Sequence, residues 1–286
     1  MLILEYLQAT PVAFIGFAVV LGLIVGSFLN VVIYRLPVIM ERDWHVQCRE
    51  LLELETPAPP AEPFNLAVPR SRCPDCGHRI SAWENIPVLS WVALKGRCSE
   101  CKSAISARYP CIELMTGLAT GVVASQFGVG EQAVAGIVLT WALIALAMID
   151  YDHQLLPDSI TLPFLWLGLG INLFDVFASP EDALIGAMAG YGILWCVFQA
   201  YRLVTGKDGM GFGDFKLLAL LGAWFGWVLL PFIIFLASVL GAAVGIALIR
   251  LRAHDRRVPI PFGPYLAIAG WTAMLWGADI MAWYLA

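Results

Sequence analysis

Two acidic clusters in the second half of the chain could supply a pair of carboxyl groups for acid–base chemistry. The clusters are MIDYDHQLLPD at residues 148–158 and GMGFGDFK at residues 209–216. Two carboxylates that lie close together cannot both ionise easily, so one holds a proton while the other acts as a base. Such a pair can hydrolyse an amide, because one group deprotonates a water and the other hydrogen-bonds to the carbonyl oxygen. Asp214 is the candidate in the second cluster, and the spacing leaves Asp150 and Asp152 open in the first.

Two glycines lie directly before Asp214 in the chain, on either side of one phenylalanine. Gly211 and Gly213 lack Cβ atoms, so an extended GFG segment could approach an extended peptide and leave its own backbone groups free to pair with it. We predict that both glycines lie along the approach of a peptide substrate. A structural alternative remains for the acidic residues, because an aspartate at a helix start is a common N-cap. Asp158, which precedes an apolar run, fits that alternative.

Two cysteine pairs form the second candidate site. The sequences CPDC at 73–76 and CSEC at 98–101 are separated by 21 residues. Each CxxC can present two thiolates to one ion, and this separation is typical of a tetrahedral zinc site. The alternatives are two disulfides or four unrelated buried thiols, and a cytoplasmic location argues against disulfides. Because four thiolates leave no open coordination position, we predict a structural Zn²⁺ bound by Cys73, Cys76, Cys98 and Cys101. The adjacent His78 is expected to support the site rather than to bind the ion.

The elements that must position these sites are apolar helices. Of the 286 residues, 60% are hydrophobic and only 14% are charged, which excludes an ordinary soluble domain. About 20 apolar residues cross a bilayer core. Runs of that kind predict eight membrane spans, at about residues 12–34, 111–128, 132–149, 159–178, 183–203, 214–229, 230–250 and 262–284. We therefore predict an all-α integral membrane protein, a polytopic bundle whose loops at one face gather around the carboxyl groups.

The basic residues predict how these spans are oriented, since loops rich in Lys and Arg stay on the cytoplasmic side. None of the 17 Lys and Arg residues lies in 1–34, ten lie in 35–108, and seven follow from residue 202 onward. Threading eight spans from an outside start places all of them at the inner side, with both termini outside. Asp150 then ends one span and Asp214 begins another at the same inner face, where an ionisable group costs less than at the membrane centre.

The chain divides by composition into three predicted parts. Residues 1–34 form the first span, 35–110 form a cytoplasmic domain with the four-cysteine zinc module at 70–108, and 111–286 form a seven-span domain that carries the carboxyl groups. Within the cytoplasmic domain we predict a short amphipathic helix and then an extended, proline-rich linker over about 41–69.

Small residues in two of the spans suit close helix contacts. Glycines occur at positions 22 and 26 in the first predicted span and at 117 and 121 in the second. A spacing of four residues places each pair on one helix face, where the missing side chains let two backbones approach. The alternative is ordinary packing, because small residues are common in membrane helices.

Taken in this order along one chain, the motifs resemble those of the type IV prepilin peptidases. The resemblance covers essentially the whole sequence and rests on GSFLNVVIYRLP at 26–37, CPDCGHRISAWENIP at 73–87, IDYDHQLLPD at 149–158, GMGFGDFK at 209–216 and PIPFGPYLAIAGW at 259–271. A GxGD motif alone would be weak, because unrelated intramembrane aspartyl proteases also carry it. The combination of all five segments is specific.

The resemblance implies a bifunctional enzyme of the bacterial inner membrane. Such enzymes cut the leader from type IV prepilins and type II secretion pseudopilins at the cytoplasmic face, and they N-methylate the new N-terminal residue with S-adenosylmethionine. It implies that Asp150 and Asp214 are the catalytic pair, that the four cysteines bind zinc, and that Gly96 serves methylation. Glu84 of WENIP is a further candidate for the cofactor site. The expected partners are the pilin substrates and membrane lipid, and no nucleic acid.

Two other classes of protein remain as alternatives. A multi-span transporter with a zinc-stabilised inner domain would also carry intramembrane carboxyl groups, although near the membrane midplane rather than at one face. A scaffold that only recruits pilins would tolerate Asn at both Asp150 and Asp214. The location of the two aspartates and the effect of those substitutions distinguish the three classes.

Overall fold

The computed structural model describes residues 2–54, 63–251 and 260–285, and every element named within these ranges is helical. Its contacts divide the chain into an N-terminal unit, residues 1–129, and a C-terminal unit, residues 130–286. The all-helical class predicted from the sequence is confirmed for the described residues. Parts of the predicted linker and of the last basic loop fall on residues 55–62 and 252–259, outside the described residues.

The N-terminal unit is built on one long helix. Helix α1 spans Leu2–Ala9, and α2 continues from Pro11 to Leu51 without a break. The predicted first span and the predicted amphipathic helix are therefore one element of 41 residues, and the prediction of two separate segments is wrong. Pro37 lies inside this helix. Helix-forming residues continue on both sides of it, with no glycine between residues 27 and 54, so the helix continues through the proline.

Helix α4, Arg108–Phe127, packs along the membrane part of α2. The two helices meet at the glycines identified from their spacing. A Cβ atom at Gly22 would lie 2.5 Å from Thr120 Oγ1 and 2.9 Å from Gly117 Cα, and one at Gly26 would lie 2.8 Å from Glu113 Cα. The predicted close contact is thus confirmed, because only residues without a side chain allow these backbones to come so near.

The segment between α2 and α4 has little regular structure. It contains a single 3-10 turn, η1 (Trp83–Asn85), the short helix α3 (Leu89–Ala93) and two isolated antiparallel bridges. Arg35 of α2 holds its beginning: this side chain is 8% exposed and donates to the carbonyl oxygens of Asn65 and Pro69, at 2.9 and 2.6 Å. The long helix α2 thereby anchors a loop whose described residues form no hydrophobic core of their own to hold it in place.

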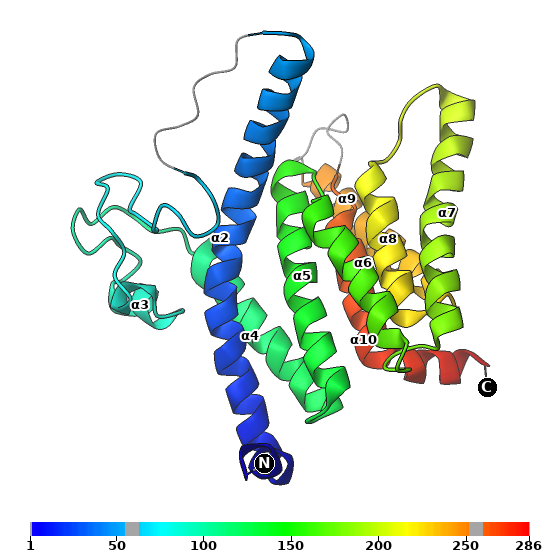
Figure 1. Ribbon diagram of the computed structural model, residues 1–286, viewed down its shortest axis with the longest axis horizontal. Coiled ribbons are helices and arrows are strands. Elements are labelled where there is room, and N and C mark those ends of the chain that lie inside the picture. Colours follow the sequence, from blue (N-terminus) through cyan, green and yellow to red (C-terminus); the bar gives the residue numbers. More distant parts are fainter. Residues whose placement is uncertain (1, 55–62, 252–259, 286) are drawn as a thin grey trace. The chain divides into compact units, whose positions relative to one another are not determined.

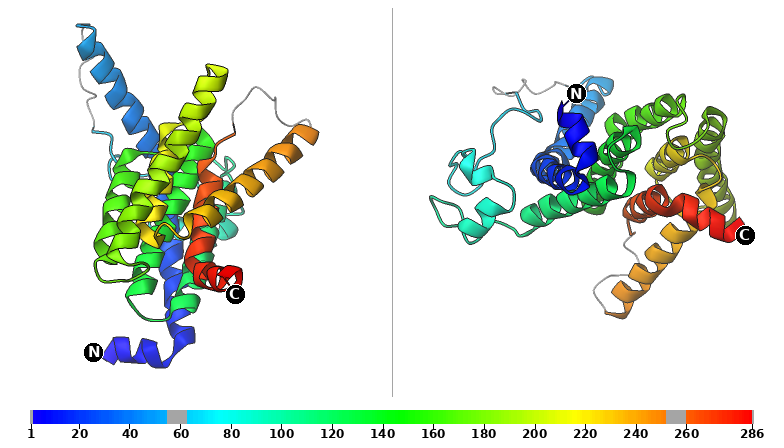
Figure 2. Two further views of the ribbon diagram at one scale, coloured as in Figure 1. Left: turned by 90° about the vertical axis from the view of Figure 1, so that its right-hand side faces the viewer. Right: turned by 90° about the horizontal axis from the view of Figure 1, so that it is seen from below.

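The C-terminal unit is a bundle of six helices (Figure 1). They are α5 (Glu131–His153), α6 (Asp158–Asn172), α7 (Pro180–Thr205), α8 (Phe212–Phe225), α9 (Leu230–Arg250) and α10 (Gly263–Leu285). Helix α8 is central, with contacts to α6, α7 and α10. Every residue from Leu217 to Phe225 is buried, as expected of a helix that is apolar all round. Figure 2 shows α9 leaning away from the other helices of this unit, and it is the least buried of the candidate spans.

The C-terminal end of α8 is fixed by polar contacts in an otherwise apolar bundle. The Asn172 side chain donates to the carbonyl oxygens of Ala223 and Trp224, both at 2.9 Å, and accepts from the N–H groups of Phe177 and Ala178. The last carbonyls of a helix lack partners within the helix, so this buried amide satisfies them. These contacts fix the position of α8 along its own axis, and with it the position of its first turn.

Four helices are long and apolar enough to cross a membrane by length and composition, namely α2, α5, α7 and α9. The predicted count of eight spans is not confirmed within the described residues. Helices α6 and α8 have 15 and 14 residues, which correspond to lengths of only about 21–23 Å against a hydrocarbon core of about 30 Å. Length thus separates these two helices from the four that meet the criterion.

Candidate active site and metal centre

Asp150 lies in the last turn of α5 and is only 5% exposed. Its backbone position follows from the apolar run before it, which buries Leu146 and Ile149 completely. The carboxylate oxygen Oδ2 accepts a hydrogen bond from the N–H of Gly263, the first residue of α10, at 2.9 Å. The first N–H groups of a helix have no partner within that helix and favour an anionic one. The start of α10 therefore orients the Asp150 carboxyl group.

Asp214 is the third residue of α8 and is 8% exposed. A cluster of aromatic rings from α7 and α8 surrounds this first turn, with ring centroids 5.4–5.8 Å apart among Phe198, Phe212, Phe215 and Tyr191. Both aspartates paired from the sequence are thus buried, Asp150 in the last turn of α5 and Asp214 in the first turn of α8. Their pairing as catalytic groups stays a prediction.

The other acidic residues of the two clusters have different surroundings. Asp152 and His153 are exposed beyond Asp150, at the end of α5. Asp158 was predicted to cap a helix, but the N-cap of α6 is Pro157 and Asp158 is its first helical residue. Its carboxylate instead accepts from Lys216 Nζ of α8 at 2.6 and 2.7 Å. The capping role predicted for Asp158 is therefore wrong, because a lysine is within reach.

The two glycines before Asp214 differ in conformation. Gly211 is the N-cap of α8, with an extended backbone at φ −78° and ψ 147°, and a Cβ placed there would meet nothing within 4 Å. Gly213 is already helical, and its Cβ would lie 2.8 Å from Leu156 Cβ. The expected extended conformation of the GFG segment thus holds at Gly211 only. A side chain would not fit at position 213, because the start of α8 packs on the loop that follows Asp150.

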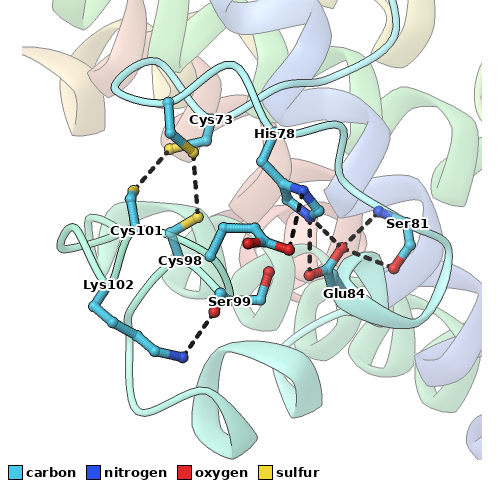
Figure 3. Close-up of polar contacts among 10 residues, drawn as sticks. Cys73, His78, Ser81, Glu84, Cys98, Ser99, Cys101 and Lys102 are labelled. Atoms are coloured by element: carbon cyan, nitrogen blue, oxygen red, sulfur yellow. Dashed lines mark hydrogen bonds and ion pairs between the residues drawn. The ribbon is translucent and has the colours of Figure 1, made fainter.

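The four predicted metal ligands converge in the N-terminal unit (Figure 3). The Sγ atoms of Cys73, Cys76, Cys98 and Cys101 all lie within 4.8 Å of one another. Two of the separations are 3.7 Å, between Cys73 and Cys101, and 4.0 Å, between Cys76 and Cys98. A tetrahedral ion with metal–sulfur bonds of about 2.3 Å places its sulfurs about 3.8 Å apart. The donor set and its size fit a zinc ion, and none of the seven cysteines forms a disulfide.

Hydrogen bonds already favour thiolates in this cluster. The backbone N–H of Cys76 and the hydroxyl of Ser103 lower the pKa of Cys73 to about 6, and Ser103 also lowers the pKa of Cys101. Metal binding requires deprotonated thiols, so these contacts reduce the proton release that accompanies binding. Although a backbone hydrogen bond at His78 favours its thiolate, burial and the neighbouring thiols raise the pKa of Cys76 to about 12, so these contacts favour a thiolate at Cys73 and Cys101 only.

Glu84, a predicted cofactor residue, is committed to the loop structure around the cysteines. Its carboxylate accepts from the N–H and the hydroxyl of Ser81, at 2.8 and 2.7 Å, and lies 3.2 Å from His78 Nε2 (Figure 3). Together with Ser99, these partners lower the pKa of Glu84 to about 2. Glu84 is therefore ionised at neutral pH, and its carboxylate oxygens are already occupied by contacts with neighbouring residues of the chain. His78 pairs with Glu84 and does not belong to the metal cluster.

Three further residues carry parts of the sites although the sequence analysis assigned them no role. Gly263 holds Asp150, Glu113 is a buried carboxyl group on α4, and Trp91 packs directly on Gly96. For Gly263 a signal was available, because a glycine before Pro264 at the start of an apolar run suits a helix N-terminus. For Glu113 the available signal was an acidic residue within an apolar run of the sequence. No local pattern distinguishes Trp91 from the other ten tryptophans.

Comparisons with known proteins agree with this arrangement. The model of the bacterial peptidase A24 N-terminal domain matches residues 20–127, and that of the type IV leader peptidase family matches residues 137–246. The chain is 60% identical to a prepilin leader peptidase/N-methyltransferase of Stutzerimonas stutzeri over 98% of this chain and 97% of the relative. It is 56% identical to the protein of that name from Pseudomonas aeruginosa, over 99% and 97% of the two chains. No solved structure matches the chain.

Proposed function

Because the chain belongs to the type IV leader peptidase family, we propose that it cleaves the leader peptide from prepilins and N-methylates the new N-terminal residue. The substrates are type IV prepilins and type II secretion pseudopilins, and the cut falls at the cytoplasmic face of the bacterial inner membrane. The observation that supports the peptidase assignment is that Asp150 and Asp214 are both buried, one in the last turn of α5 and the other in the first turn of α8.

In this mechanism the two carboxyl groups share the work of amide hydrolysis. One removes a proton from a water that attacks the carbonyl carbon of the scissile bond, and the other donates a hydrogen bond to the carbonyl oxygen. The Gly263 N–H keeps the Asp150 carboxyl group in one orientation, which limits the motion that would otherwise separate the pair. The extended backbone at Gly211 offers unobstructed space beside the first turn of α8, where a substrate strand would pass.

The location of the aspartates favours a peptidase over a transporter. Asp150 is three residues from the end of α5 and Asp214 is the third residue of α8. A transport site would be expected near the membrane midplane, at interrupted helices. We propose that α4, α6, α8 and α10 complete eight spans with the four helices that meet the length criterion, that basic loops lie inside, and that both aspartates lie at the inner face.

The four cysteines would hold a structural zinc ion, and S-adenosylmethionine would supply the methyl group. With all four sulfurs bound, the ion has no open position and serves to fix the two CxxC loops. Gly96 and Glu84 stay as candidates for the cofactor site on the residues of this same loop region. The role of Gly96 rests on the family resemblance, and that of Glu84 rests on its place in the same loop region.

The direct test uses the full chain in detergent with a purified prepilin and S-adenosylmethionine. Mass spectrometry of the product should show the loss of the leader and the gain of one methyl group on the new N-terminus. Cleavage without a methyl group would contradict the proposed transferase, and an intact prepilin would contradict both activities. A prepilin whose cleavage site is blocked by substitution provides the matched control for unspecific proteolysis.

A further inference from the structure

The N-terminal unit contains a cavity of about 580 Å³ that the peptidase mechanism does not use. Small-molecule sites have volumes of about 300–1,000 Å³, so this cavity can hold a nucleoside-sized ligand. Its walls come from α2, from the loop that bears the cysteines, from α3 and from the start of α4. They combine aromatic, amide and carboxyl side chains, including Asn30, Asn85, Trp91, Tyr109 and Glu113.

One wall of the cavity is the indole of Trp91, and Gly96 lies behind it. The indole Nε1 donates to the carbonyl oxygen of Ile105 at 3.1 Å, and the N–H of Gly96 donates to the carbonyl oxygen of Trp91 at 2.8 Å. A Cβ at Gly96 would lie 2.9 Å from Trp91 Cζ2 and 3.1 Å from Cε2, and Gly96 has φ +67°, where glycine is favoured. Gly96 does not line the cavity, so it can act on a ligand only through the position of this indole.

The lining of the cavity also includes a buried carboxyl group. Glu113 of α4 is 9% exposed, and its Oε2 accepts from the N–H of Val88 at 2.7 Å. Val88 has φ +61° and ψ −48°, a backbone conformation that a β-branched residue rarely adopts. The bond to Glu113 holds this strained backbone in place. Glu113 thus lies at the cavity with the N–H of Val88 and the side chain of Ser27 as its hydrogen-bond partners.

We propose that this cavity is the methyl-transfer site, with S-adenosylmethionine against Trp91 and the N-terminal amine of the cleaved pilin beside Glu113. The inference rests on the proposed methyltransferase function and names its site. An adenine ring can stack on the indole, and a sulfonium is attracted by an aromatic face and by a carboxylate. Gly96 is then a positioning residue that keeps the indole out of the space that the ligand needs.

The chemistry of the transfer explains why a carboxylate suits this wall. The uncharged amine forms a new N–C bond as the C–S bond breaks, and the sulfur keeps the bonding electrons and becomes a neutral thioether. The positive charge therefore passes from sulfur to nitrogen, and no proton has to move in that step. A carboxylate of Glu113 that lies beside both atoms would stabilise the positive charge on the sulfur before the transfer and on the nitrogen after it. Its own protonation state would not change.

A measurement of ligand binding tests the proposed site independently of methylation activity. Isothermal titration of the full chain in detergent with S-adenosylhomocysteine should give a dissociation constant that Gly96→Ala weakens at least tenfold. The control is Gly128→Ala, since Gly128 has a comparable φ of +64° with nothing within 4 Å of its Cβ. If Gly96 acts through the indole, Trp91→Phe should remove the clash, so Gly96→Ala should cost less than threefold in the Trp91→Phe background.

Glu113→Gln should leave the binding of S-adenosylhomocysteine, whose sulfur is uncharged, within threefold of wild type. It should raise the KM for a pre-cleaved pilin in methylation at least tenfold, while prepilin cleavage stays within threefold. If wild type binds S-adenosylhomocysteine and neither Gly96→Ala nor Trp91→Ala changes its affinity, the cavity is not the site. The proposed function would remain intact. A wild type that neither binds the probe nor methylates pilin would overturn the proposed methyltransferase as well.

Discussion

In the C-terminal unit the two candidate catalytic aspartates are positioned by helices, whereas in residues 63–107 the candidate functional groups are positioned by loops. Asp150 and Asp214 lie on α5 and α8, and each directly adjoins a fully buried apolar side chain, Ile149 and Phe215 respectively. The cysteines and Glu84 sit on segments with two isolated bridges, one 3-10 turn and one five-residue helix. Packing defines the first site, and hydrogen bonds with a candidate metal cluster define the second.

This difference indicates how each site should fail. A site on packed helices keeps its geometry as long as the bundle is folded, because the helices cannot move independently in a close-packed interior. A site on loops depends on the few cross-links that replace a core, so that losing the ion should release it. Four substitutions or removals test this contrast, beginning with the largest expected effect.

Replacing either aspartate by asparagine should stop cleavage and leave methylation. Asp150→Asn and Asp214→Asn keep the size of the side chain but remove the acid–base function, so we expect a loss of about 10³-fold or more in kcat. A pre-cleaved pilin should still be methylated at a rate near wild type. Asp152→Asn, on an exposed neighbour of Asp150, is the matched control and should cut normally. Efficient cleavage by both variants would show that the pair is structural.

Removing the metal should affect the loops and spare the bundle. Cys98→Ser/Cys101→Ser, or a zinc chelator, should reduce bound zinc to background and reduce methylation at least as strongly as cleavage. The reason is that Trp91 and Gly96 lie between the two cysteine pairs, whereas both aspartates lie on packed helices. Metal analysis together with both activities is the measurement. Cleavage that disappears while methylation survives would reverse the assignment of the ion to the methyl-transfer region.

The sequence was sufficient for the parts of both sites that depend on short-range pattern. The spacing of cysteine pairs predicts a tetrahedral cluster directly. Glycines four residues apart predict helix faces suited to close contact, because a helix repeats its face at that interval, and the structure adds that these faces of α2 and α4 meet each other. The class of fold follows from the apolar runs. These features are local, so that reading residues in order recovers them.

What the sequence could not give depends on residues far apart in the chain. The bond from Gly263 to Asp150 spans 113 positions, and the ion pair of Lys216 with Asp158 spans 58. Gly96 could be associated with methylation by family resemblance alone, whereas its contact with Trp91 needs the structure. The continuity of α2 was missed for another reason: the chain was divided where its composition changes, whereas the helix continues past the end of the apolar run and through Pro37.

Gly263→Ala tests whether packing alone positions the dyad. Its Cβ would lie 2.6 Å from Asp150 Oδ2 and 3.0 Å from Cγ, so the carboxyl group must move. A displacement of about 1 Å at a reacting group can cost about 10²-fold, and we expect kcat for cleavage to fall by about 10–100-fold with little change in methylation. Gly192→Ala, in a helix position with nothing within 4 Å, is the control for the added methyl group. Unchanged cleavage by Gly263→Ala would show that this hydrogen bond is dispensable.

The smallest effect is expected from the ion pair that joins the starts of α6 and α8. The Lys216 and Asp158 side chains are 29% and 53% exposed, so water screens their attraction. A double-mutant cycle of Lys216→Met and Asp158→Asn should give a coupling of about 0.2–1 kcal/mol in unfolding, and less at high salt. Cleavage should change far less than in Gly263→Ala, since neither residue contacts a catalytic carboxyl group. If Lys216→Met alone lowered cleavage as strongly as Asp214→Asn, the helices would not be sufficient to place the dyad, and this surface pair would belong to the active site.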